Sequence, residues 1–199
     1  MRANVNGGRR RLLNGLRIAC WGLAAALLAA PLVAMRFTDE VLWTAFDFAV
    51  FAAMLAAAGG AMELAVRMSG DWTYRAAAAV AVLAGFLLIW STLAVGIIGD
   101  EDEPANLMFF GVLLIGALGA AIARFRAEGL GRTLLAMAFA QAAAGATALI
   151  AGWGATANIW PMDIIGASGF FTAAWLLAAG LFRKAAADQR AGPDLRRPA

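Results

Sequence analysis

The sequence predicts an all-α protein, a polytopic integral membrane bundle of six transmembrane helices. The 199 residues are 63% hydrophobic and only 15% charged, with a mean hydropathy of +0.76. A soluble domain of this length could not bury so much apolar surface, whereas lipid allows the outside of a protein to be apolar. The apolar residues fall into stretches of about 18–25 residues, long enough for a helix to cross roughly 30 Å of hydrocarbon. These stretches cover residues 18–35, 41–66, 76–98, 105–123, 133–152 and 162–182.

Polar residues flank the six stretches at both ends of the chain. We expect residues 1–15 to form a basic tail, residues 16–185 to form the transmembrane domain, and residues 186–199 to form a flexible tail. The first stretch has an alternative interpretation as a signal peptide, because a basic segment precedes an apolar run at 18–30 and residues 32–34 could serve as a cleavage site. Cleavage there would leave five helices.

The distribution of basic residues predicts how the helices are oriented. Fifteen of the sixteen Lys and Arg residues fall on one face of the six-helix topology, and only Arg36 falls on the other. Cytoplasmic loops carry an excess of Lys and Arg, so both termini are predicted to be cytoplasmic. The preference for Arg over Lys and the Ala and Gly content are typical of a GC-rich bacterium. The sequence therefore predicts a multi-pass protein of a bacterial inner membrane.

One structural unit is repeated three times along the chain. It consists of a helix, a short outer loop, a second helix and a basic inner end. The outer loops contain residues 38–40, 102–104 and 160–163, at a spacing of about 60 residues. This pattern is compatible with three tandem helical hairpins that arose by triplication. The alternative is that any six-helix protein with short loops has a similar pattern.

The residue types that most enzyme and cofactor sites need are absent. The sequence has no histidine, which excludes histidine-ligated haem, the usual zinc and copper sites and a Ser-His-Asp triad. Cys20 is the single cysteine, which excludes an intramolecular disulfide, and we expect it to be a small buried side chain. We predict no cofactor, no metal site and no enzyme activity. The net charge of +3 follows from the membrane topology, so no nucleic-acid partner is predicted.

Asp47 is the first candidate for a functional residue. We expect it about two turns below the outer end of the second stretch, with Trp43 and Phe51 on the same helix face. A carboxylate at the bilayer centre costs roughly 2.5–3.5 kcal/mol, so Asp47 must face protein or water or be protonated. One hypothesis is a proton or cation site on a transport path. The alternative is a structural ion pair with Arg36.

Glu63 lies near the inner end of the same stretch, four residues before Arg67. This order is the favourable one for a helical ion pair and predicts a structural role. The alternative is a water-accessible hinge beside Gly59 and Gly60. Asp47 and Glu63 lie sixteen positions apart, which is about 160° around a helix, so they form no single polar stripe.

An acidic run precedes the fourth stretch and consists of Asp100, Glu101, Asp102 and Glu103. Hard cations prefer carboxylates, so one hypothesis is an outer-face site that attracts cations such as Ca²⁺. The run lacks the spacing of an EF-hand. The alternative is that these acids offset the positive end of the helix dipole, as acids at a helix N-terminus do.

Gln141 and several small residues point to contacts between helices. Gln141 lies near the middle of the fifth stretch, where we predict an interhelical hydrogen bond, with a polar path as the alternative. Faces of small residues allow backbones to approach closely within a chain or between chains. A homo-oligomer or a larger membrane complex is therefore a candidate partner, besides the lipid bilayer. The small residues recur at 52, 56 and 60, at 116 and 120, and at 136, 140 and 144.

The segments W-T-A-F-D-F at 43–48 and G-D-E-D-E-P-A-N-L-M at 99–108 resemble those of small bacterial inner-membrane proteins that have no assigned activity. The resemblance covers most of the chain and implies no functional residues. The residues themselves favour a small transporter or permease-like protein for a cation or small solute. The alternative is a non-transporting accessory or scaffold subunit of a membrane complex. A membrane enzyme is third, because carboxylates can perform acid–base chemistry although no nucleophile–base pair is visible.

Overall fold

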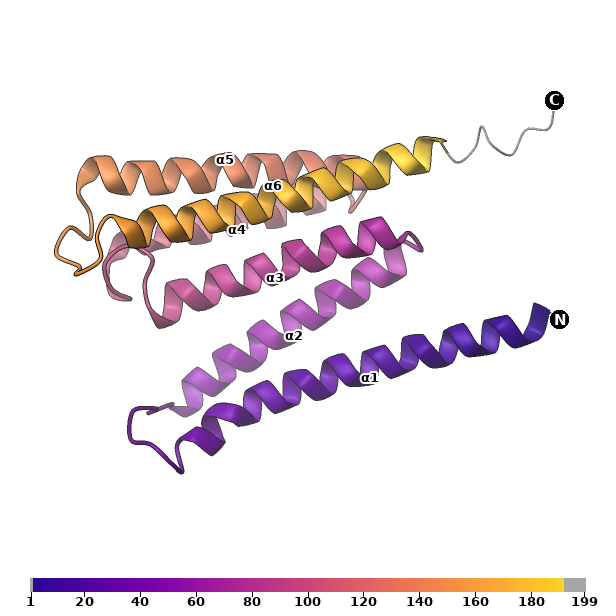
Figure 1. Cartoon of the computed structure of the whole chain (residues 1–199), viewed down its shortest axis with the longest axis horizontal. Helices are drawn as coiled ribbons and strands as arrows, with labels where there is room; N and C mark the ends of the chain where they lie inside the picture. The colour runs from indigo at the N-terminus through magenta and orange to yellow at the C-terminus, as the bar shows by residue number, and fades with distance from the viewer. Residues whose placement is uncertain (1, 192–199) are drawn as a thin grey trace. The chain divides into compact units, whose positions relative to one another are not determined.

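The computed structural model describes residues 2–191, with the side chains of residues 17–191. Within this part of the chain, six α-helices are long and apolar enough to cross a membrane, the fourth together with a short 3₁₀ helix, η1 (Figure 1). The all-helical, six-span fold predicted from the sequence is confirmed. In chain order the elements are α1 (Arg2–Ala34), α2 (Ala45–Met68), α3 (Trp72–Ala94), η1 (Pro104–Asn106), α4 (Leu107–Ile122), α5 (Ala127–Ala151) and α6 (Met162–Ala191).

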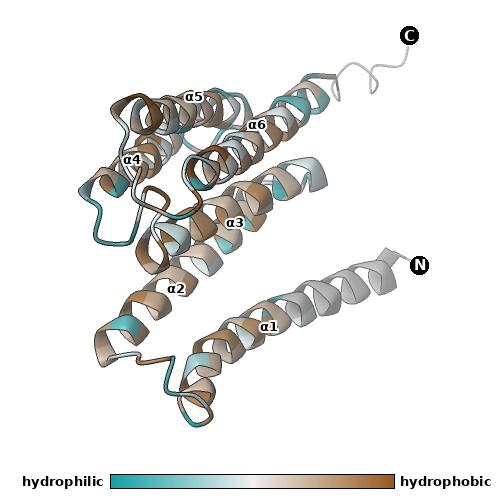
Figure 2. Ribbon diagram, turned by 60° about the vertical axis from the view of Figure 1, so that its left-hand side comes forward, coloured by the Kyte–Doolittle hydropathy of each residue, from teal (hydrophilic) through white to brown (hydrophobic). Residues whose placement is uncertain are grey.

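The helices are longer than the apolar stretches at both ends of the chain. Helix α1 begins at Arg2, and α6 continues to Ala191, so parts of the expected polar tails are helical. Met1 and residues 192–199, which belong to the same predicted tails, lie outside the described residues. Figure 2 shows hydrophilic residues in the loops and near the end of α6, and mainly hydrophobic residues along the spans. The described part of the protein therefore has the polarity pattern of a multi-pass membrane protein.

The chain divides into two compact units, residues 1–61 and residues 62–199. In the second unit, α6 is the central helix, because it packs extensively on α5 and also on α3. Helix α4 packs on α5 and makes only slight contact with α3. The helix pair α3–α4 is thus much less closely packed than the pair α5–α6. Internal triplication stays a prediction.

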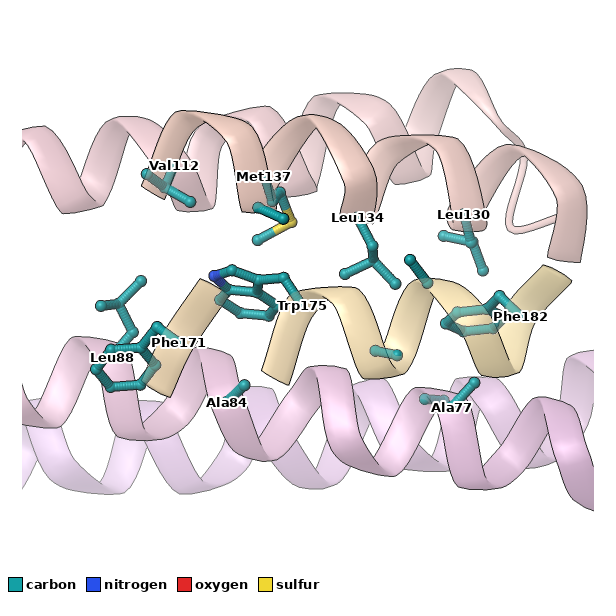
Figure 3. Close-up of a cluster of buried hydrophobic side chains, with 14 of the residues drawn as sticks. Ala77, Ala84, Leu88, Val112, Leu130, Leu134, Met137, Phe171, Trp175 and Phe182 are labelled. Atoms are coloured by element: carbon teal, nitrogen blue, oxygen red, sulfur yellow. The ribbon is translucent and has the colours of Figure 1, made fainter. Parts of the chain in front are cut away.

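Aromatic side chains of α6 fill the core of the second unit. Figure 3 shows Phe171, Trp175 and Phe182 between α3 and α5, and all three are buried. Small residues such as Ala77 and Ala84 of α3 are buried in the same cluster. Large residues on one helix and small residues on its neighbour allow dense packing of this kind without voids.

Glycines of α4 allow that helix to approach α5 closely. A Cβ atom added to Gly116 would lie only 2.7 Å from Sδ of Met137, and one added to Gly119 would overlap Thr133. The predicted small-residue face at 116 and 120 therefore serves a contact within the chain. Such close approach of backbones maximises van der Waals contact in lipid, where burial of apolar surface no longer drives association.

The unit of residues 1–61 is much more open. The ring of Trp21 in α1 lies against Gly59 of α2, at 3.0 Å from where a Cβ atom would be. The membrane-spanning part of α1 has no buried residue. Cys20 is exposed accordingly, so the expectation of a buried cysteine was wrong. Hydropathy alone cannot distinguish a side chain that faces protein from one that faces lipid.

Candidate functional site

Asp47 lies at the start of α2 and caps that helix. Its Oδ2 atom accepts hydrogen bonds from the Thr44 backbone N–H at 2.7 Å and from the Thr44 hydroxyl at 2.8 Å. The Asp47 N–H donates to Oγ1 of Thr44 at 3.4 Å, which completes a capping box. Helix α2 begins at Ala45, so the expected position two turns inside the helix was wrong. Among the described residues, the alternative ion pair of Asp47 with Arg36 is not formed.

The predicted ion pair between Glu63 and Arg67 is confirmed. Arg67 donates to Oε1 of Glu63 through Nε at 3.3 Å and through Nη2 at 3.2 Å. The Arg67 side chain is 70% exposed and that of Glu63 is 21% exposed. A pair in this environment contributes little to stability, about 0.3–0.5 kcal/mol.

The acidic run at 100–103 belongs to a loop that Asn106 organises. The buried Asn106 side chain accepts from the backbone N–H groups of Ile97 and Ile98, at 3.0 and 2.9 Å. Its Nδ2 donates to the carbonyl oxygens of Ile98 and Asp100, at 3.1 and 2.7 Å. Both ends of the amide are therefore satisfied by the backbone. The sequence-based interpretation had overlooked Asn106, whose signal was a single polar residue at the start of an apolar stretch.

Glu103 in the same run caps a helix. Its carboxylate accepts from the Ala105 N–H at 3.4 Å, at the N-terminus of η1. Among the described side chains of residues 17–191, no three acidic or cysteine side chains come together in a way that could hold a metal ion. The local geometry of Glu103 matches the capping alternative. Cation attraction by Asp100, Glu101 and Asp102 stays a hypothesis.

Gln141 is the most deeply buried polar residue of the described chain. Its side chain is 0% exposed. Neither its Nε2 nor its Oε1 atom has a hydrogen-bond partner among the described residues. The predicted interhelical hydrogen bond is therefore not formed. The amide keeps two donors and an acceptor that remain free for another polar group.

Further buried polar atoms without partners lie on α6. They are Oγ of Ser168, Oγ1 of Thr172 and Nε1 of Trp175. Residues 168, 172 and 175 follow one another at helical spacing, so they share one face of α6. A Cβ atom added to Gly145 of α5 would lie 2.5 Å from Oγ of Ser168, which fixes the register of the two helices.

This register sets the heights of the polar residues along the helix pair. Helices α5 and α6 are antiparallel neighbours, and Gly145 faces Ser168. One turn along each helix from that contact, Gln141 of α5 and Thr172 of α6 lie at the same height. We call Gln141, Ser168, Thr172 and Trp175 the polar seam.

The polar seam is uncharged, and its unpaired polar atoms lower the stability of the fold. Leaving one buried amide or hydroxyl unpaired costs about 1–3 kcal/mol, and hydrocarbon supplies no alternative partner. All of its side chains are neutral, with hydroxyls and an amide that both donate and accept, and an indole that only donates. This set suits a small uncharged molecule with hydrogen-bonding groups and lacks a counter-charge for a cation.

The fold and the seam together define the class of the protein, which is a polytopic helical membrane protein with a buried, neutral polar cluster. Comparison with protein families, curated proteins and solved structures found no match.

Proposed function

We propose that the protein is a small permease-like protein of a bacterial inner membrane that admits a small uncharged polar solute at the polar seam. The observation that carries this proposal is the fully buried Gln141 amide, whose donor and acceptor atoms have no partner among the described residues. Polar residues that are retained inside a membrane at a cost to stability are functional candidates by default. The role that the sequence suggested for Asp47 passes to Gln141, because Asp47 is a helix cap.

A flux measurement on purified protein in lipid vesicles tests this proposal. After an osmotic step with glycerol or urea, light scattering should report faster solute entry than in protein-free vesicles. Gln141→Leu should abolish the difference, because it removes all hydrogen-bonding atoms at nearly constant volume. Ala142→Leu is the matched control on the exposed side of α5 and should retain the flux. Equal rates in wild-type and protein-free vesicles would reject the proposal.

The stability of Gln141→Leu separates a functional amide from a structural one. Because the native amide is buried without partners, its removal should raise the free energy of unfolding by about 1–2 kcal/mol. The midpoint of thermal unfolding in detergent measures this change. A lower midpoint would mean that the amide is bound within the fold and holds α5 to α6.

The proposed orientation, with both termini in the cytoplasm, rests on the segregation of basic residues. Reporter fusions at residues 102 and 199 should give external and cytoplasmic signals, respectively. The same side for both positions would contradict the alternating topology.

A second candidate function is that of a non-transporting accessory or scaffold subunit. The observation that favours it is a face of small exposed residues on α2, which includes Ala53, Ala56, Ala57 and Gly60. Such a face permits close contact with another membrane helix. If this function is correct, Gly60→Leu should weaken self-association measured by native mass spectrometry, and Gln141→Leu should leave it unchanged.

A further inference from the structure

A concave site opens at the end of the second unit where α4 ends and α5 begins. Its volume is about 410 Å³, within the range of sites that hold small molecules. The lining residues come from the end of α2 and the loop that follows it, from α3, from the α4–α5 turn, and from α5 and α6. We call it the arginine pocket. Its polar lining includes Tyr74, Arg124, Arg126, Glu128, Gln189 and Arg190.

The turn that carries two of these arginines has a strained backbone. Arg124 and Phe125 have φ angles of 48° and 57°, in the left-handed region that disfavours residues with a side chain. The Tyr74 hydroxyl of α3 donates a 2.7 Å hydrogen bond to the Phe125 carbonyl and ties the turn to the bundle. The Tyr74 ring is itself packed edge-on against Phe182 of α6. The arginines are therefore held on a braced turn, and strain of this kind is concentrated at functional sites.

The charges in the pocket are not balanced internally. Glu128 is the acid in its lining, and it already pairs with Arg132 at 2.6 Å and with Arg190 at 3.6 Å. Among the described side chains of residues 17–191, Arg124 and Arg126 take part in no ion pair. Arg126 also occupies the N-cap position of α5 without a side-chain hydrogen bond to the helix. The positive end of the α5 dipole thus adds to the field of the two arginines.

We propose that the arginine pocket binds a phosphate group, supplied by the headgroup of an anionic phospholipid or by a free phosphate ion. Arginine presents a planar fork of donors that matches phosphate oxygens, and basic pockets between helices at a membrane surface bind anionic headgroups. The pocket lies at the helix ends, the depth at which headgroups lie. This inference is independent of solute passage through the polar seam.

The test is ligand-induced stabilisation of the full-length protein in neutral detergent. The protein is titrated separately with phosphatidylglycerol, phosphatidylcholine and inorganic phosphate, and the midpoint of thermal unfolding is followed. Phosphatidylglycerol should raise the midpoint more than phosphatidylcholine does. The variant R124Q/R126Q should need about 10- to 30-fold more ligand for half of the effect. The control R67Q/K184Q loses the same charge outside the pocket and should respond like wild type.

The outcomes separate the two sources of phosphate from a general charge effect. A response to inorganic phosphate alone, lost in R124Q/R126Q and kept in the control, supports the site and assigns it to a free ion. If neither phosphatidylglycerol nor inorganic phosphate raises the midpoint, the proposal is overturned. An equal weakening in R124Q/R126Q and the control also overturns it, because total charge would then explain the binding. If the double variant does not fold, R126Q alone tests the same prediction outside the strained positions.

Discussion

The polar seam and the arginine pocket both include residues of α5 and α6, but their polar side chains differ in burial and in charge. The seam lies within the spans, is buried and contains only neutral side chains. The pocket lies at the ends of the spans and is rich in charge, and its arginines are exposed to the surface. The difference follows from the surroundings, which are hydrocarbon at the level of the seam and water at the ends of the spans. A neutral group without a partner costs a few kcal/mol in hydrocarbon, whereas a charge there costs more unless it reaches water.

Polar groups in the two regions differ in how strongly they indicate a function. Arginines at helix ends are already favoured by the positive-inside rule, so their number alone indicates no ligand. The phosphate site is inferred from two further observations: the turn at Arg124 is strained, and neither Arg124 nor Arg126 forms an ion pair with a described side chain. No comparable rule favours an unpaired amide or hydroxyl inside a span, where it lowers stability. The seam is thus the stronger indication of function.

The largest expected effect comes from placing the same charge in the two regions. Gln141→Arg puts a guanidinium into a fully buried position and should cost several kcal/mol, enough to prevent recovery of folded protein. Gln189→Arg adds the same group at the exposed arginine pocket and should leave the yield near that of wild type. The yield of monodisperse protein in detergent measures both. Equal yields would show that the seam is open to water, and the contrast between the two regions would be wrong.

A smaller effect concerns the strain in the pocket, and another helix end provides the reference. Helix α5 ends with Gly152 at φ 69°, where Gly152 N–H donates to Leu149 and Trp153 N–H donates to Ala148. Helix α4 ends with the same pattern, a Schellman motif, but Arg124 takes the glycine position. The arrangement at 124 is therefore one that glycine would adopt with less strain.

We predict that Arg124→Gly is more stable than Arg124→Ala by about 1 kcal/mol, because only glycine relieves the left-handed backbone. The same pair of changes at Arg132, inside α5, should have the reverse order by about 1 kcal/mol. Both glycine and alanine at 124 should weaken phosphate binding. Thermal unfolding and the lipid titration measure these two effects separately. A more stable alanine variant at 124 would show that the turn is not strained.

The cap of α2 is the next effect in size. Thr44→Ala removes a hydroxyl that accepts from the Asp47 N–H and donates to the Asp47 carboxylate, and it should lower stability by about 1 kcal/mol. Asp47→Asn should retain part of the cap and any solute flux, since the proposed solute site lies at the seam. The vesicle flux assay checks this. Loss of flux in a folded Asp47→Asn variant would return Asp47 to the transport path.

Local patterns made part of this structure predictable. Glu63 and Arg67 were found from their spacing, because an i,i+4 pair needs only one helix. The six spans were found from hydropathy, which is likewise a property of each helix by itself. Asp47 was misplaced because the apolar pattern was followed to residue 41, although the motif Thr44-x-x-Asp47 indicates a helix start at that point.

Other features depend on contacts between distant segments and were not predictable. Ser168, Thr172 and Trp175 repeat at a helical period that a sequence can reveal, but their level relative to Gln141 depends on the register of α5 against α6. The arginine pocket depends on a left-handed backbone at Arg124, for which the sequence has no glycine signal. Its two arginines looked like ordinary positive-inside residues.

The smallest expected effect tests whether the ion pair between Glu63 and Arg67 of α2 is only structural. Exchange of the two residues in the variant E63R/R67E keeps the ion pair of α2 but reverses its favourable order relative to the helix dipole. The pair is largely exposed on its arginine side, so the loss should be only about 0.3–0.5 kcal/mol. Thermal unfolding should therefore change by little, and solute flux and phosphate binding should stay at wild-type levels. A folded variant without flux would place Glu63 in the mechanism beside Gln141, and charge would then matter within the spans as well as at their ends.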